Sequence, residues 1–298
     1  MSVQQASTIR TASTARSSLI SASDDAIICS VYRYHFLTAI QVCRLFYDPD
    51  SLKFVRSKLK RLTDLGYLHR LLLPTVSLGK PAFIYTLGRK GINYLRSAGF
   101  EDFHRFRPSG QEEHSYFFLR HTLAVNDFLI AAECLRDSVP GVVLADFAHE
   151  RDLKKTPVVV KTKADEKVGV IPDAWLDFHL DGKLRVSVIL ELDRGTVQQK
   201  PFARKLRGLL AYSQGPYQEF FGSDALTIAF ACTAGPHRCE QMRRWCEDVL
   251  KETKSEQDSE IFLFTSLEED QEWDPKTLFL DPIWHQPFSK TPVALLGV

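Results

Sequence analysis

The sequence has no long apolar run, no paired-cysteine motif and almost no net charge. No stretch approaches the roughly 18 apolar residues of a membrane-spanning helix, so we expect no membrane partner. None of the six cysteines forms a CxxC pair, and His237 with Cys239 is not followed by a second pair at zinc-finger spacing. Cysteines in contexts such as AIICSVY favour reduced, buried thiols and a cytoplasmic location.

The net charge of +1 over 298 residues hides an uneven distribution. Residues 38–107 hold thirteen Lys or Arg against five Asp or Glu, giving +8, and residues 108–298 hold twenty-two against thirty, giving −8. This asymmetry indicates that one half contacts a polyanion. The length has room for two domains, and a composition of 44% hydrophobic and 25% charged residues is ordinary for a globular protein.

Residues 1–22 are rich in Ser, Thr and Ala and contain no acid. We interpret them as a disordered basic tail, with an organellar transit peptide as the alternative. Three helix signals follow. The first helix is predicted to start at Ser23-Asp24-Asp25 and to run to about Phe36. Thr38 is expected to cap a short second helix, and Ser51 a third that Gly66 ends.

The third helix, LKFVRSKLKRLTDLG, has its apolar residues at helical spacing and basic residues on its other faces. Two apolar runs after it, near residues 67–73 and 82–87, predict a hairpin, and a further helix spans about 89–97. Three helices followed by a hairpin is the order of a winged helix-turn-helix, whose third helix enters the major groove of double-stranded DNA. The residues predicted to contact DNA are Arg56, Lys58, Lys60, Arg61 and, at the tip of the wing, Lys80. The alternatives are that these cations only solvate a helix, or that the winged helix serves dimerisation.

The predicted domains are a winged helix over residues 23–100, a linker over 101–115 and a second domain over 116–298. The second domain is expected to begin with a helix over 116–137 and a strand from Val142 that reaches Glu150, followed by a charged, mobile loop over 154–169. Strands over 225–234 and 260–266, a helix over 236–252 and a tail complete it. Alternating strands and helices predict a sheet with helices on its faces, so the fold class of the whole chain is α+β.

Three acids lie on two neighbouring strand-like runs in VGVIPDAWLDFHLDGKLRVSVILELDRG. Glu191 and Asp193 are two residues apart, so both side chains leave the same face of a strand. If the runs pair as a hairpin about Asp181-Gly182, Asp173 approaches them. Carboxylates of this kind are ligands of Mg²⁺ or Mn²⁺.

These residues resemble the core motif of the PD-(D/E)XK nuclease superfamily, in which an Asp after a Pro is followed on the next strand by an acid, a spacer and a Lys. Pro172-Asp173 and Glu191-Leu192-Asp193 match it except at the last position. The resemblance implies a divalent-metal-dependent nuclease with metal ligands Asp173 and Glu191, to which Glu150 could be added. Lys200 or Lys205 would replace the missing lysine, and Asp193 is a further catalytic candidate. A degenerate, non-cutting domain is the alternative, as is a hairpin whose acids pair with Arg194 and Lys205.

Seven segments follow one another along the chain, namely FLTAIQVCRLFY, LKRLTDLGYLHRL, FIYTLGRKGINYL, HTLAVNDFLIAA, IPDAWLDF, ILELDRGTVQQ and KLRGLLAY. In this order they resemble the replication-relaxation proteins of bacterial plasmids and mobile elements. The resemblance implies a DNA-binding protein of plasmid or mobile-element DNA replication or relaxation, and a homodimer is left open. The sequence contains no HxH or paired-tyrosine pattern, so we do not expect a tyrosine-dependent relaxase. Competing hypotheses are a non-catalytic transcriptional regulator or adaptor whose second domain dimerises or docks a partner, and a protein-interaction scaffold.

Overall fold

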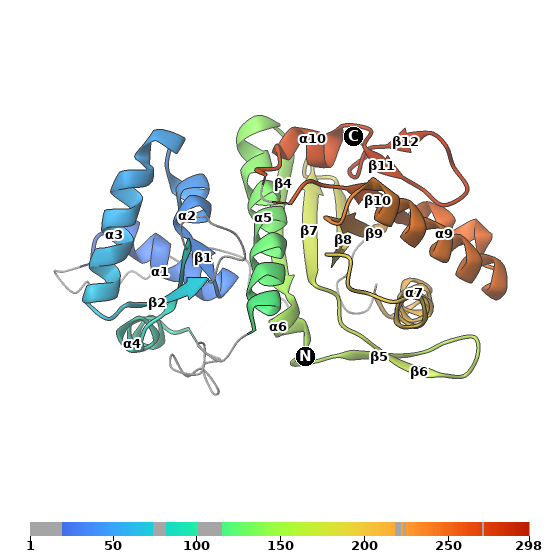
Figure 1. Cartoon of the computed structure of the whole chain (residues 1–298), viewed down its shortest axis with the longest axis horizontal. Helices are drawn as coiled ribbons and strands as arrows, with labels where there is room; N and C mark the ends of the chain where they lie inside the picture. Colours follow the sequence, from blue (N-terminus) through green and yellow to red (C-terminus); the bar gives the residue numbers. More distant parts are fainter. Residues whose placement is uncertain are drawn as a thin grey trace. The chain divides into compact units, whose positions relative to one another are not determined.

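The chain divides into two units that share one helix (Figure 1). The structure, a computed structural model, describes residues 20–73, 82–100, 115–217, 222, 225–269 and 271–297. The described residues up to Ile130 form the N-terminal unit and those from Ala131 onward the C-terminal unit, and the division falls within helix α5 (Tyr116–Ser138). The predicted tail and linker lie largely outside the described residues, so those boundaries stay predictions.

The N-terminal unit has the predicted order of three helices, a hairpin and a fourth helix. The first helix begins and ends earlier than expected, because Ser21 rather than Ser23 is its N-cap. Its elements are α1 (Ala22–Tyr34), β1 (Leu37–Thr38), α2 (Ala39–Phe46), a 3-10 turn (Pro49–Ser51), α3 (Leu52–Asp64), β2 (Leu68–Leu73), β3 (Ala82–Leu87) and α4 (Arg89–Ser97).

Two capping boxes fix the starts of α1 and α2. The Ser21 hydroxyl accepts a hydrogen bond from the Asp24 amide, and the Asp24 carboxylate accepts one from the Ser21 amide. Thr38 and Gln41 repeat this exchange at α2. Each box satisfies amide groups that the first turn of a helix leaves without an intrahelical partner.

The three strands of this unit form an antiparallel sheet in the order β1-β3-β2. One face of the hairpin, with Leu71, Leu73 and Ile84, packs against Leu119 and Leu123 of α5. On α3, the predicted stripe is buried at Val55, Leu59 and Leu62, whereas Leu52 and Leu65 at its ends are only partly buried.

The C-terminal unit is built on a seven-stranded mixed sheet in the order β12-β11-β10-β9-β8-β7-β4. Strands β8, β9 and β10 are parallel, β7 pairs antiparallel with β8, and β4 pairs antiparallel with β7. Its elements are β4 (Val142–His149), α6 (Glu150–Leu153), β5 (Val158–Lys161), β6 (Lys167–Val170), β7 (Ala174–Leu180), β8 (Leu184–Asp193), α7 (Gln199–Ser213), β9 (Ala225–Cys232), α9 (Pro236–Thr253), a 3-10 helix (Glu256–Ile261), β10 (Phe262–Ser266), α10 (Pro275–Leu280), β11 (Trp284–His285) and β12 (Pro292–Val293).

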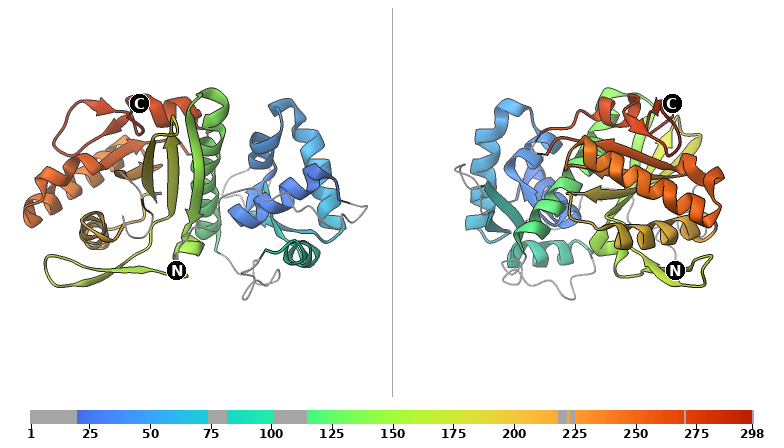
Figure 2. Two further views of the ribbon diagram at one scale, coloured as in Figure 1. Left: turned by 180° about the vertical axis from the view of Figure 1, so that it is seen from behind. Right: turned by 45° about the vertical axis from the view of Figure 1, so that its right-hand side comes forward.

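Helices α7 and α9 lie side by side on one face of this sheet (Figures 1 and 2). They are the crossover connections between the parallel strands, and they bury alternate residues such as Trp175, Ile189 and Phe230. The opposite face receives α10, whose Phe279 ring lies 5.4 Å from that of Phe178. The residues of β8 that face α7 and α9 therefore have odd numbers, which places Glu191 and Asp193 on that face.

Two predictions for this unit are wrong. The segment 154–169, expected to be a mobile loop, contains the antiparallel pair β5 and β6. Val160, Val168 and Val170 alternate along this pair and pack into the core that α7 covers, which explains why it is ordered. The predicted tail after residue 266 contains α10, β11 and β12. All six cysteines are free thiols, of which four are buried and two, Cys29 and Cys134, are only partly buried. No helix among the described residues is both long and apolar enough to cross a bilayer.

Candidate functional site

The hairpin of β7 and β8 brings Asp173 beside Glu191. The two strands pair as predicted around Asp181 and Gly182, with Ala174 opposite Leu190. The amide of Asp173 donates to the Leu190 carbonyl at 3.1 Å, and its Oδ2 accepts from the Leu192 amide at 2.7 Å. Asp173 therefore ends the strand pairing while its carboxylate stays buried, at 8% exposure.

Lys205 of α7 lies against these two acids. Its Nζ forms an ion pair with Glu191 Oε2, and the Lys205 side chain is 39% exposed whereas that of Glu191 is 6% exposed. Burial alone would lower the pKa of Lys205, but the charges of Glu191 and Asp173, the hydrogen bond to Glu191 and the charge of Glu150 together raise it. The Lys205 ammonium is thus paired with Glu191 and feels the charges of Asp173 and Glu150, and of the two candidate lysines Lys205 is the one beside Glu191.

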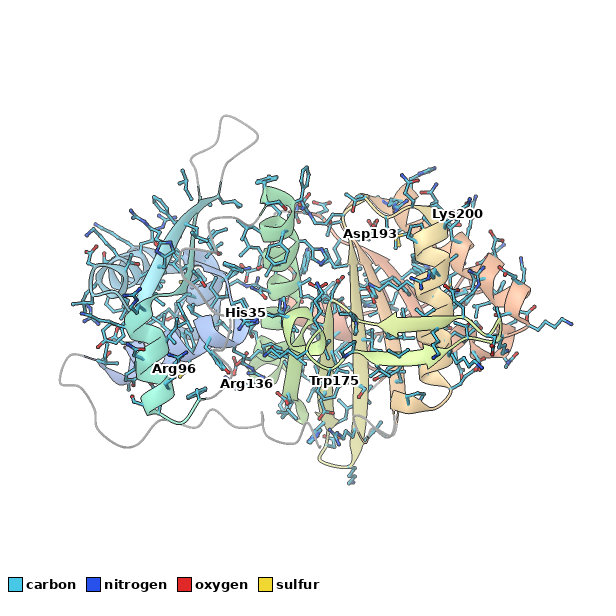
Figure 3. All side chains as sticks on the ribbon, turned by 90° about the horizontal axis from the view of Figure 1, so that it is seen from below. His35, Arg96, Arg136, Trp175, Asp193 and Lys200 are labelled. Carbon is cyan, nitrogen blue, oxygen red and sulfur yellow. The ribbon has the colours of Figure 1, made fainter. Side chains whose placement is uncertain are left out.

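Two other candidate residues are Glu150, whose carboxylate has another partner, and Lys200, which is exposed. The Glu150 amide donates to the Asp173 carbonyl at 2.9 Å, so its backbone adjoins the site, but its carboxylate pairs with Lys154 at 2.6 Å. Lys200 is an exposed residue in the first turn of α7 (Figure 3).

Asp193 is held by a different partner, Arg238 of α9. Arg238 Nε donates to Asp193 Oδ2 at 2.8 Å, and the two side chains are 14% and 3% exposed. Asp193 also accepts from the amides of Gly195 and Val197, at 3.0 and 3.4 Å. It therefore organises the loop between β8 and α7. Arg194, which one alternative paired with these acids, forms an ion pair with Glu269 at 2.6 Å.

The carboxylates do not form a preorganised metal site. Across the described ranges, no three His, Cys, Asp or Glu side chains are placed so that together they could hold a metal ion. Hydrogen bonds and ion pairs within the protein already engage Asp173 and Glu191. The arrangement as it stands does not fit a Mg²⁺ or Mn²⁺ ion held by Asp173, Glu191 and Glu150, and that site stays a prediction.

The second group of candidate residues lies on α3. Residues 53, 56, 57, 60 and 64 lie away from the buried stripe, and all are exposed. Lys60 forms a surface ion pair with Asp64 at 2.5 Å, with the two side chains 67% and 60% exposed. The charge of Arg56 lowers the pKa of Tyr85 of β3, which burial raises. Lys80 lies outside the described residues.

Lys58 and Arg61, also on α3, form ion pairs with Asp24 of α1. Lys58 Nζ lies 2.9 Å from Asp24 Oδ1, and Arg61 Nη2 lies 2.5 Å from Oδ2. The Lys58 side chain is only 10% exposed, whereas that of Arg61 is 45% exposed. Burial would raise the pKa of Asp24, but hydrogen bonds from Arg61, Lys58 and Ser21 hold it well below its usual range.

The comparison with protein families found a match to the replication-relaxation family over residues 29–222. This range covers both α3 and the hairpin that carries Asp173 and Glu191. The chain belongs to the replication-relaxation family. Membership in the replication-relaxation family supports a role related to replication or relaxation. The comparisons with curated proteins and with solved structures gave no match.

Proposed function

We propose that the chain is a DNA-binding protein of plasmid or mobile-element replication or relaxation. Its N-terminal unit acts as a winged helix-turn-helix: α3 enters the major groove of double-stranded DNA and the hairpin of β2 and β3 contacts the backbone. The observation that carries the proposal is the outward face of α3. Arg56 and Lys60 are exposed there, opposite the buried stripe of Val55, Leu59 and Leu62.

The distribution of charge supports the same assignment. Residues 38–107 carry a net charge of +8 in a chain whose total is +1, so the positive charge is concentrated around this helix and hairpin. A local excess of this size attracts phosphates without making the whole protein adhere to every polyanion. Lys58 is assigned to the fold rather than to DNA because its ammonium is largely buried against Asp24.

The test is a binding assay with a labelled DNA duplex over a series of salt concentrations, using Arg56→Ala and Lys60→Ala. The affinity falls as salt is added, and each lost phosphate contact should make the slope of log K against log salt shallower by about 0.9. Lys161→Ala is the matched control, because Lys161 is also an exposed lysine paired with an Asp four residues away, at 2.5 Å. Slopes equal to wild type in both α3 variants would contradict the proposal.

A second candidate function is DNA cleavage by a nuclease-like C-terminal unit. The specific observation in its favour is Lys205, which lies against Glu191 and near Asp173, where a lysine is needed to compensate for the Asp at 193. The side chains of Asp173 and Glu191 would have to rearrange to admit a divalent ion, because hydrogen bonds and an ion pair within the protein already engage them. If cleavage is absent, the C-terminal unit is an adaptor or dimerisation domain.

Cleavage is tested by incubating supercoiled plasmid with the protein and Mg²⁺ or Mn²⁺. If the site is active, Glu191→Gln and Lys205→Gln should each lower the nicking rate at least about 100-fold. Lys200→Gln is the matched control on the same helix and should retain the wild-type rate. Nicking that survives both site variants would assign the activity to other residues or to a contaminant.

A further inference from the structure

The hairpin of the N-terminal unit exposes two large apolar side chains beside an arginine. Leu72 of β2 and Phe83 of β3 are opposite each other in the strand register and are 54% and 41% exposed. The guanidinium of Arg70 stacks over the Phe83 ring, with its Cζ 4.2 Å from the ring centroid. Exposed Leu and Phe side chains cost free energy in water, so their combination with a cation calls for a ligand that is both apolar and anionic.

These residues share one face of the sheet. Cross-strand partners point to the same side of an antiparallel sheet, and Arg70 is paired with Tyr85 just as Leu72 is paired with Phe83. The other face, with Leu71, Leu73 and Ile84, is occupied by the core. The face with Arg70 is buried at Leu68, Tyr85 and Leu87, near the base of the hairpin, and exposed at Arg70, Leu72 and Phe83. These three exposed residues make up the outward face of the hairpin.

The outward face of the hairpin continues into α3. Helix α3 packs against β2. The pKa of Tyr85 is raised by burial and lowered by the charges of Arg70 and Arg56. Tyr85 itself is buried, at 4% exposure, whereas Arg56 is exposed on α3 and Arg70 is exposed on β2. The exposed surface therefore consists of Arg56 of α3 and the stacked pair of Arg70 and Phe83 on the hairpin.

An apolar ring flanked by guanidinium groups matches the chemistry of unpaired nucleotides. Closed duplex DNA presents phosphates but hides the faces of its bases within the stack, whereas an opened segment presents both. Aromatic side chains stack on exposed bases of any sequence, and arginines hold the adjoining phosphates. On a closed duplex, Arg56 and Arg70 can bind the phosphates, but the Phe83 ring finds no exposed base on which to stack.

We propose that the outward face of the hairpin binds unpaired bases, with Phe83 as the stacking platform and Arg70 and Arg56 as phosphate ligands. The protein then prefers DNA that contains an opened segment over the same DNA fully paired. This inference rests on the proposed DNA binding by the N-terminal unit and adds the state of the DNA that it selects.

The experiment compares two fluorescently labelled DNAs of the same length with the full chain. One is a closed duplex, and the other has a central bubble of mismatched bases. The variants are Phe83→Leu, which keeps an apolar side chain but removes the ring, and Phe117→Leu as the control. Phe117 is also an exposed phenylalanine of this unit, at 69% exposure, but lies on α5 rather than on the hairpin. Circular dichroism verifies that each variant is folded.

We expect wild type and Phe117→Leu to bind the bubble about tenfold more tightly than the closed duplex, since stacking one base on an aromatic ring has an effect of this order. Phe83→Leu should bind the two DNAs about equally, with its affinity for the closed duplex unchanged. Equal affinities in the wild type, or a preference that survives Phe83→Leu, would overturn this inference and leave duplex binding intact. No binding to either DNA would overturn the proposed function itself.

Discussion

At the scale of single residues, Asp24 shows how a buried acid binds cations that the sequence alone places on an exposed face of a helix. It is 1% exposed and pairs with Lys58 and Arg61, two of the residues expected from the sequence to contact DNA. Its role is to join α1 to α3. The basic residues of α3 are therefore of two kinds, those that hold the unit together and those, such as Arg56 and Lys60, that are exposed on its outward face.

Replacing Asp24 should destabilise the N-terminal unit. Asp24→Asn removes the negative charge between two cations, and breaking a buried ion pair in this way costs roughly 3 kcal/mol. Urea denaturation followed by circular dichroism at neutral pH measures the loss. Asp64→Asn is the control, because its surface pair with Lys60 should change the free energy of unfolding by at most about 0.5 kcal/mol. An equal effect of the two variants would contradict the assignment.

The pH dependence of this loss has a definite sign. The folded-state pKa of Asp24 lies below the value of about 3.9 for an unfolded chain, so the ionised carboxylate stabilises the fold above that pH. The stabilisation is lost as the pH falls below about 4 toward the folded-state pKa. The difference in free energy of unfolding between wild type and Asp24→Asn should therefore narrow as the pH is lowered from about 6 to about 3.

At the scale of elements, α4 packs closely on the turn between α3 and β2. A Cβ atom added at Gly91 would overlap the backbone carbonyl oxygen of Tyr67. A backbone atom cannot move aside as the end of a side chain can. Gly91 therefore fixes how near α4 comes to the chain leading into the hairpin.

Gly91→Ala should lower the free energy of unfolding by at least about 1 kcal/mol, even though alanine is the better helix former. Denaturation by urea provides the measurement. Gly169→Ala is the matched control, because a Cβ at Gly169 would meet no atom within 4 Å, and its backbone has no positive φ. If Gly91→Ala proved as stable as wild type, α4 would have freedom to shift that this packing does not predict.

The pair β5 and β6 shows why one element was not recognised from the sequence. The two strands read VVVK and KVGV, and four residues in each make a pattern too short to separate from a loop. What orders it is contact with α7: a Cβ at Gly208 would lie 2.7 Å from Val168. Lys163, between the strands, also donates to Ser255 Oγ at 2.7 Å. Both contacts join residues far apart in the chain, so the sequence of the strands alone does not indicate them.

At the scale of the whole molecule, the sequence predicts elements well and side-chain pairings poorly. Long periodic segments such as α5 and the capping residue Thr38 lie where local physical chemistry places them. Asp193 and Arg238, 45 residues apart, meet only because the crossover helices cover the face of the sheet from which Asp193 projects. The pairing of Glu191 with Lys205 was among the expected alternatives because α7 follows β8 directly.

The two edge strands of the seven-stranded sheet, β4 and β12, are both poor templates for a further strand. β4 is the last strand on one side of the sheet, and its pairing with β7 shifts register between Leu144 and Asp146. The strand on the opposite side, β12, is only two residues long. An unbroken eight-residue border would offer a template on which a strand from another copy could add and begin a fibril. The register shift in β4 and the short length of β12 therefore disfavour the addition of a further strand at either edge of the sheet.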